Sequence, residues 1–160
     1  MQKKAKAIPE GHHSISPYLI CRGADRAIEF YKKAFGAKEI SRMPGPEGKI
    51  MHAEILIGDS VVMISDELPI MKVHFSPTGE SAPISLMLYV EDVDAVFKQA
   101  VGAGARTEMP PQDMFWGDRY GKVVDPFGHR WGMATHKEDL SPEEIQKRQE
   151  EFFAKVPGMH

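Results

Sequence analysis

The sequence predicts an α+β protein built from two modules of the same design. Each module is expected to contain a strand, a helix and three further strands, once over residues 14–66 and again over residues 84–136. The segments also match in sequence, because a shift of 68 positions pairs the helix-ending Gly36 with Gly104. An internal repeat constrains an architecture more than a single motif does, so we predict a duplicated βαβββ fold.

The elements of the first module follow from apolar spacing and turn residues. Residues 14–22 are rich in apolar side chains and are expected to form a strand. A helix is expected from Ala24 or Asp25 to Phe35, because apolar residues recur at helical spacing and Gly36 follows at the usual C-terminal position. Three further strands are expected at residues 38–42, 49–57 and 60–65, with a tight turn at Gly58 and Asp59 before the last.

The second module repeats this order. A strand is expected at residues 84–90, and a helix is expected to begin at Asp92, because an apolar stripe follows at helical spacing. Pro126 presets φ and Gly128 tolerates positive φ, so the sequence around them is a strong turn signal. Three strands are therefore expected at residues 106–109, 116–124 and 129–135.

Three segments lie outside the modules. Residues 1–13 are expected to be an N-terminal tail, and residues 67–83, with three prolines and a glycine, to be a linker. Residues 137–160 are expected to hold a C-terminal helix from about Pro142 to Phe153, because Ser141 is a good capping residue and Pro142 suits the first turn. We expect this helix to lie on the surface or on a partner subunit, because its apolar face is sparse.

Composition excludes several classes of protein. The chain has 160 residues, is 42% hydrophobic and carries a formal net charge of −3, with no long run of one sign. Nothing in this balance favours binding to nucleic acid or to an anionic membrane. Cys21 is the single cysteine and lies in a predicted apolar strand, which indicates a buried, inert thiol and a reducing compartment. With no signal peptide and no apolar stretch of membrane-spanning length, we expect a soluble, cytoplasmic protein.

One stretch before the Pro126 turn is typical of a ligand-binding wall. Trp116, Arg119 and Tyr120 place two aromatic rings and a planar cation within five residues, which suits a flat, polar organic ligand. An ordinary hairpin whose aromatic side chains fill a core remains the alternative. Strand alternation places Trp116 and Tyr120 on one face and Arg119 on the other, unless a bulge intervenes.

Three motifs resemble one protein family. They are Gly-Ala-Asp-Arg-Ala-Ile-Glu-Phe-Tyr at residues 23–31, Met-His-Ala-Glu at residues 51–54, and Trp-Gly-Asp-Arg-Tyr-Gly at residues 116–121 followed by Asp-Pro-Phe-Gly-His at residues 125–129. These motifs resemble the vicinal-oxygen-chelate superfamily, which includes glyoxalase I, bleomycin-resistance proteins and extradiol dioxygenases, and most closely its PhnB-like branch. The resemblance implies curved mixed sheets around a cleft, and a homodimer with clefts at or near its interface.

The resemblance also implies where a metal would be held. The superfamily's metal enzymes use four ligands on the concave sides of the sheets, at positions that correspond here to Ser16, Met63, Ser85 and Gly132. None of these is His, Glu or Asp, so a divalent metal is not supported there and we expect no cofactor.

His52 and Glu54 share one face of a predicted strand. They are expected to be a hydrogen-bonded structural pair, part of an atypical metal site completed by His74 or His129, or a base tuned by a carboxylate.

Two functions remain open. The first is binding of a small, aromatic or planar molecule without metal; its candidate residues are Tyr18, Met63, Met87, Tyr89, Trp116, Arg119, Tyr120 and Arg130. The second is an enzyme of lyase/isomerase or dioxygenase type, with an atypical metal site or with metal-free acid–base catalysis by His52 and Glu54. In either case we expect a small organic ligand and a homodimer, and no nucleic acid or membrane partner. The residues do not specify the ligand or the reaction.

Overall fold

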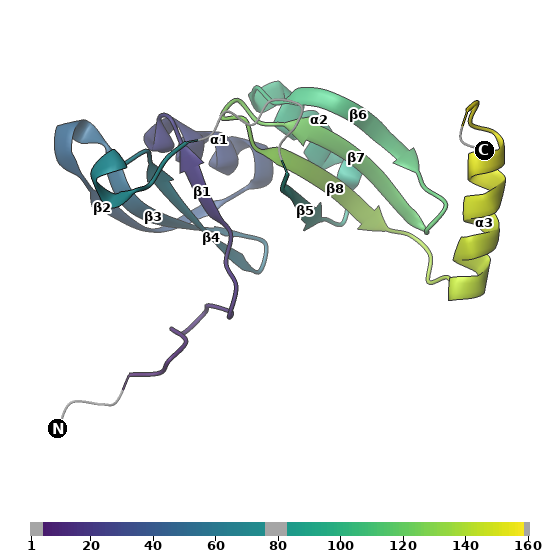
Figure 1. Ribbon diagram of the computed structural model, residues 1–160, viewed down its shortest axis with the longest axis horizontal. Helices are drawn as coiled ribbons and strands as arrows, with labels where there is room; N and C mark the ends of the chain where they lie inside the picture. The colour runs from purple at the N-terminus through teal and green to yellow at the C-terminus, as the bar shows by residue number, and fades with distance from the viewer. Residues whose placement is uncertain (1–4, 76–82, 159–160) are drawn as a thin grey trace. The chain divides into compact units, whose positions relative to one another are not determined.

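The structure is a computed structural model that describes residues 5–75 and 83–158 (Figure 1). The chain forms two compact units that divide between residues 79 and 80. Each unit has its own four-stranded sheet and its own helix, so we describe each by itself. No helix in the described ranges is long and apolar enough to cross a membrane.

The first unit is a mixed sheet with one helix. Its strands lie in the order β1-β4-β3-β2, with β1 and β4 parallel and the other neighbours antiparallel. Short 3₁₀ turns at Pro46–Gly48 and Pro69–Met71 follow β2 and β4. The elements are β1 (Tyr18–Cys21), α1 (Ala24–Phe35), β2 (Lys38–Pro44), β3 (Ile50–Ile57) and β4 (Ser60–Asp66).

The second unit repeats this topology and adds a helix. Its strands lie in the order β5-β8-β7-β6, again with the first two parallel and the rest antiparallel. The elements are β5 (Ser85–Tyr89), α2 (Val93–Ala103), β6 (Arg106–Asp113), β7 (Asp118–Val124), β8 (Arg130–His136) and α3 (Pro142–Ala154). The predicted α+β fold of two βαβββ modules is confirmed.

Several strand boundaries differ from the prediction. The first strand starts at Tyr18 rather than near residue 14, because Pro17 has no N–H to extend the pairing. Strand β6 continues through Pro110 and Pro111 to Asp113, which is tolerated because β6 lies at the edge of its sheet. Trp116 precedes β7 instead of lying in it, because the chain turns at Gly117, whose N–H donates to the carbonyl of Met114.

One face of each sheet is buried under the helix of its own unit. In the first unit the fully buried Ile28 and Tyr31 of α1 join Ile55 of β3 in the core. In the second unit Phe97 of α2 packs on Gly121, where an added Cβ would lie 3.1 Å from the Phe97 ring. Cys21 is buried, as predicted. The opposite face of each sheet therefore carries the side chains that remain available for a site.

The last strand of each unit holds the start of the helix of that unit. Asp66 of β4 accepts hydrogen bonds from the backbone N–H groups of Gly23 (3.0 Å) and Ala24 (2.9 Å) at one oxygen. Its other oxygen accepts from the N–H of Ile50 at 2.7 Å. Thr135 of β8 accepts from the N–H of Val93 at 2.8 Å. Thr135 stands 69 positions after Asp66, as Val93 does after Ala24, so the repeat includes this contact.

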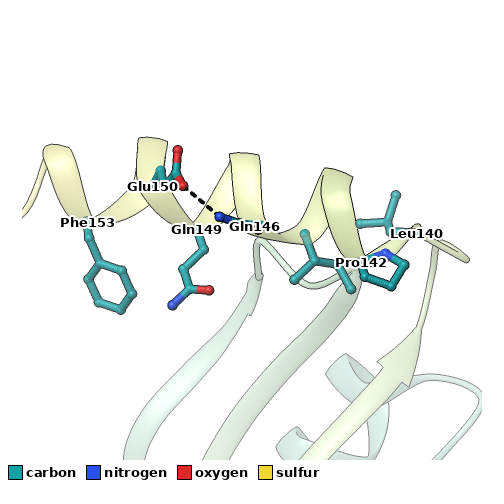
Figure 2. A pocket seen from close by; sticks show the side chains of 7 residues that line it. Leu140, Pro142, Gln146, Gln149, Glu150 and Phe153 are labelled. Atoms are coloured by element: carbon teal, nitrogen blue, oxygen red, sulfur yellow. Dashed lines mark hydrogen bonds between the residues drawn. The ribbon is translucent and has the colours of Figure 1, made fainter.

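Helix α3 begins where it was predicted. The hydroxyl of Ser141 accepts from the N–H of Glu144 at 3.2 Å, and Pro142 is the first helical residue. Arg148 binds Glu138 at 2.8 Å, and the Phe152 ring lies 5.4 Å from that of Phe115, which fastens the helix to its unit. One face of α3 borders a hollow (Figure 2), lined by Leu140, Pro142, Ile145, Gln146, Gln149, Glu150 and Phe153.

Candidate functional site

The site in the second unit begins at a backbone turn that only glycine fits well. Gly117 has φ of 98°, and an added Cβ would lie 2.6 Å from the carbonyl oxygen of Glu138. The Gly117 carbonyl in turn accepts from the N–H groups of Lys137 and Glu138. This close approach of two backbone segments sets the position of the neighbouring Trp116.

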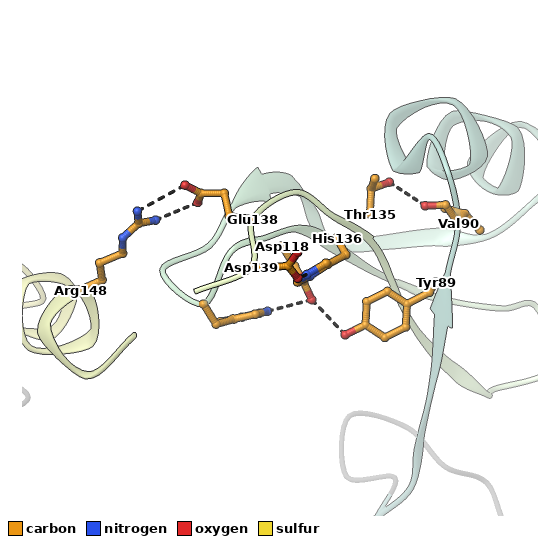
Figure 3. Close-up of polar contacts among 9 residues, drawn as sticks. Tyr89, Val90, Asp118, Thr135, His136, Glu138, Asp139 and Arg148 are labelled. Atoms are coloured by element: carbon orange, nitrogen blue, oxygen red, sulfur yellow. Dashed lines mark hydrogen bonds and ion pairs between the residues drawn. The ribbon is translucent and has the colours of Figure 1, made fainter. Parts of the chain in front are cut away.

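Asp118 is the polar centre of the site (Figure 3). Its side chain is buried, with only 3% of the residue exposed. One carboxylate oxygen accepts from the Tyr89 hydroxyl at 3.0 Å and from the Trp116 indole N–H at 3.1 Å. The other lies 2.7 Å from Nδ1 of His136. A buried carboxylate with these partners holds both aromatic side chains in fixed orientations.

His136 lies between two carboxylates. Its Nε2 lies 2.7 Å from Asp139, and the hydrogen bonds to Asp139 and Asp118 raise the pKa of its imidazole. A histidine that holds its proton more firmly is suited to neutralising Asp118 rather than to accepting a proton from a substrate.

Four predicted binding residues gather on the sheet face opposite α2. Tyr89 and Tyr120 flank Ala134 in the sheet, and the rings of Trp116 and Tyr120 are 5.6 Å apart. Met87 pairs with Gly132. We call the surface formed by Met87, Tyr89, Trp116 and Tyr120 the aromatic face.

Two predicted residues lie elsewhere in this unit. Arg119 binds Asp94 of α2 at 2.7 Å and Asp113 at 3.3 Å, and these hydrogen bonds raise the pKa of its guanidinium. It is therefore on the helix side of the sheet, as strand alternation predicted, and the structure does not bring it to the aromatic face. Arg130 binds Glu108 at 3.1 Å and stays on the same sheet side as Gly132, two residues along β8.

The first unit carries a series of hydrogen-bonded polar side chains on the sheet face opposite α1. Tyr18, which pairs with Met63, hydrogen-bonds through its hydroxyl to Nδ1 of His52 at 2.9 Å. Glu54 Oε1 lies 3.4 Å from Nε2 of His52 and 3.2 Å from Nε2 of His12. The predicted His52–Glu54 contact is thus present. His12 was missed because it lies in a predicted tail, where no pattern links it to a strand.

The hydrogen bonds among these polar side chains favour the ionised form of the Glu54 carboxylate. Burial alone raises the pKa of Glu54, but the hydrogen bonds from His12 and His52 outweigh it, so the net shift is downward. The pKa of His12 is raised by its contact with the Glu10 carbonyl and then by Glu54. Glu54 can therefore orient His52 as a hydrogen-bonded base.

The residues at the metal positions implied by the resemblance do not fit a divalent metal. Met63 offers a soft sulfur, while Ser16 and Ser85 are weak ligands. At Gly132, an added Cβ would lie 2.9 Å from Cε2 of Tyr120 and 3.0 Å from the Met87 sulfur, so the space of a ligand side chain is already filled. Within residues 5–75 and 83–158, no group of three or more His, Cys, Asp or Glu is placed to hold a metal ion.

Comparisons with known proteins agree with this fold. A family model described as "Glyoxalase/Bleomycin resistance protein/Dioxygenase superfamily" matches residues 12–133. The Mycobacterium tuberculosis protein Rv0887c is 43% identical over 136 residues, which covers 83% of this chain and 80% of that protein.

Solved structures show the same architecture. The crystal structure of TioX from Micromonospora sp. ML1 is similar with a TM-score of 0.59 and 28% identity, over 77% of this chain and 99% of TioX. A PhnB protein from Bacillus cereus has a TM-score of 0.60 over 77% of this chain and 99% of that chain, and at 22% identity this likeness concerns the fold alone.

Proposed function

The chain belongs to the Glyoxalase/Bleomycin resistance protein/Dioxygenase superfamily, and on this premise we propose that it binds a small aromatic or planar organic molecule at the aromatic face, without a divalent metal. One observation carries the proposal. Large side chains remain open on this face, since 46% of Met87 and 61% of Tyr89 is exposed on β5, an edge strand of the second sheet. Exposed apolar side chains that lie together are typical of a binding surface, so their exposure supports a ligand site here.

The arrangement of the aromatic face supports the proposal. Asp118 holds the Tyr89 and Trp116 side chains by hydrogen bonds before any ligand arrives. A ligand therefore loses little free energy in ordering these rings, which favours tight binding of a flat molecule.

The residues at the positions implied for the superfamily's metal are chemically unsuited to a divalent ion. The positions implied for its ligands offer no imidazole or carboxylate, and Tyr120 fills the space beside Gly132. Aromatic stacking and hydrogen bonds then supply the affinity instead.

A second candidate function rests on the first unit. Tyr18, His52 and Glu54 form a hydrogen-bonded series in which a lowered carboxylate pKa keeps Glu54 negative beside His52. A carboxylate that orients a histidine is the arrangement of general acid–base catalysts. A metal-free enzyme in which His52 accepts a proton from the substrate is therefore the alternative to simple binding.

We also propose that the protein forms a homodimer in the cytoplasm. The hollow beside α3 is lined by apolar side chains, among them Leu140, Ile145 and Phe153, which a partner subunit would cover. A single, buried Cys21 suits a reducing compartment. Light scattering at micromolar concentration should give twice the chain mass of 17.9 kDa. A mass near that of one chain would contradict the dimer.

A ligand screen on protein of known metal content tests the binding proposal. Elemental analysis of the purified protein comes first, followed by thermal-shift measurements with aromatic compounds and with divalent cations. We expect aromatic compounds to raise the melting temperature and to change Trp116 fluorescence, while divalent cations leave both unchanged. The proposal fails if the protein contains one zinc, nickel, manganese or iron per chain that is lost in Met63→Ala or Ser85→Ala.

A further inference from the structure

A small polar pocket lies on the sheet face that carries the aromatic face. It has a volume of about 110 Å³, and its lining residues are Pro83, Ser85, Glu108, Lys122, Arg130 and Trp131. Pockets for whole drug-sized ligands measure roughly 300–1,000 Å³, whereas one water takes about 30 Å³. The pocket is thus sized for a substituent of a ligand, not for an aromatic body.

Strand register places this pocket next to the aromatic face. Arg130 pairs with Ser85, and two residues further along β8 Gly132 pairs with Met87 and Lys122. Two residues of a strand span about 7 Å. Because the Tyr120 ring lies over Gly132, a ligand of two fused rings on that ring can extend a substituent to Arg130.

Among the described residues that line the pocket, one positive charge is left without a carboxylate partner. Its charged residues are Lys122, Arg130 and Glu108, and Glu108 pairs with the Arg130 guanidinium at 3.1 Å. The Lys122 ammonium lies 5.8 Å from the centre of the Tyr120 ring, at the border between pocket and aromatic face.

The hydrogen bonds of Arg130 are also incomplete. Its Nε atom is buried and has no hydrogen-bond partner in the part of the chain that the structure describes. A guanidinium has five N–H donors, and a buried charged donor without an acceptor is unfavourable. A ligand oxygen that reached this guanidinium would remove the deficit.

We propose that the ligand of the aromatic face carries a single carboxylate, which binds in this pocket to Arg130 and Lys122. The inference rests on the proposed function, because the aromatic body of the same ligand must lie on Trp116 and Tyr120. Glu108 cancels one of the two positive charges of Lys122 and Arg130, which leaves a net charge of one in the pocket. A ligand group with one negative charge, such as a carboxylate, therefore fits better than a phosphate dianion. The carboxylate completes the donors of Arg130 in the planar geometry that guanidinium groups favour.

Calorimetry on the full chain with three probes tests this inference. The probes are 2-naphthoate, its neutral analogue 2-naphthamide, and 2-naphthyl phosphate. We expect naphthoate to bind about tenfold or more tightly than naphthamide, which is the contribution of one hydrogen bond between charged groups. Arg130→Gln should remove this preference and leave the Kd for naphthamide unchanged, which also shows that the variant is folded.

Two further variants sharpen the test. Lys98→Gln removes the same charge from the exposed surface of α2, so it should keep the naphthoate preference. Glu108→Gln raises the net charge of the pocket, so it should make naphthyl phosphate bind as tightly as naphthoate or more so.

The outcomes separate this inference from the function on which it rests. If naphthamide binds as tightly as naphthoate, or if Arg130→Gln keeps the preference, the carboxylate pocket is refuted and aromatic binding stands. If neither naphthoate nor naphthamide binds, the aromatic face is not a binding surface and both proposals fall.

Discussion

Replacing Asp66 with alanine is expected to lower the free energy of unfolding by roughly 2–6 kcal/mol, because the N–H groups of Ala24 and Ile50 are buried and each costs about 1–3 kcal/mol when it loses its acceptor. Asp66 is 7% exposed and accepts from the N–H groups of Gly23, Ala24 and Ile50. In the described residues, Asp66 supplies the side-chain cap of helix α1, since the N-cap residue Gly23 has no side chain of its own to accept a hydrogen bond. The substitution therefore leaves both the start of α1 and the start of β3 without acceptors.

Chemical denaturation followed by circular dichroism measures this effect. Asp59→Ala, in the exposed turn between β3 and β4, is the matched control and should change stability by no more than about 0.5 kcal/mol. Both tryptophans, Trp116 and Trp131, lie in the second unit, so fluorescence follows that unit separately. Equal stabilities for Asp66→Ala and Asp59→Ala would show that the three hydrogen bonds do not hold the unit together.

Replacing Trp116 or Tyr120 with alanine is expected to abolish ligand-induced stabilisation while changing the stability of the free protein much less than a core substitution does. Both side chains are half-buried and face a surface, so their removal leaves no sealed cavity. Phe97, by contrast, is buried between α2 and Gly121, and Phe97→Ala should cost about 3–5 kcal/mol.

The measurement is denaturation of all three variants with and without 2-naphthamide. Trp116→Ala also removes a hydrogen bond to Asp118, so Trp116→Phe serves as a variant that keeps the ring and loses only the N–H. If Trp116→Ala and Tyr120→Ala lose as much stability as Phe97→Ala, these aromatics belong to a core and the aromatic face is not a binding wall.

Local pattern was enough to predict most of the fold. Helix α1 ends at Phe35 because Gly36 takes the left-handed conformation there, with φ of 66°, and that signal is visible in the sequence. Helix α2 starts after Asp92, whose side chain accepts from the N–H of Ala95 three residues later. Alternation along β7 also separated Tyr120 from Arg119 correctly, because each residue's face depends only on its neighbours.

Contacts between distant residues could not be predicted in this way. The role of Asp118 depends on Tyr89, which is 29 residues away, and that of Glu54 depends on His12, which is 42 residues away. Asp66 was assigned to the end of a module and not to a helix cap, because its partners lie near the start of the chain. The binding roles of Tyr18, Met63 and Arg119 remain predictions.

Asp66 and Thr135 bind helix starts that are distant in sequence, and this separation affects the order in which the chain folds. Each helix start depends on a residue 42 positions later in the sequence. A growing chain on the ribosome therefore makes α1 before Asp66 exists, and α2 before Thr135 exists. The chain loses the entropy of closing such a long loop before the stabilising contacts form, which slows folding. Each module is thus expected to fold all at once when its last strand arrives, and a fragment cut before that strand to remain unfolded.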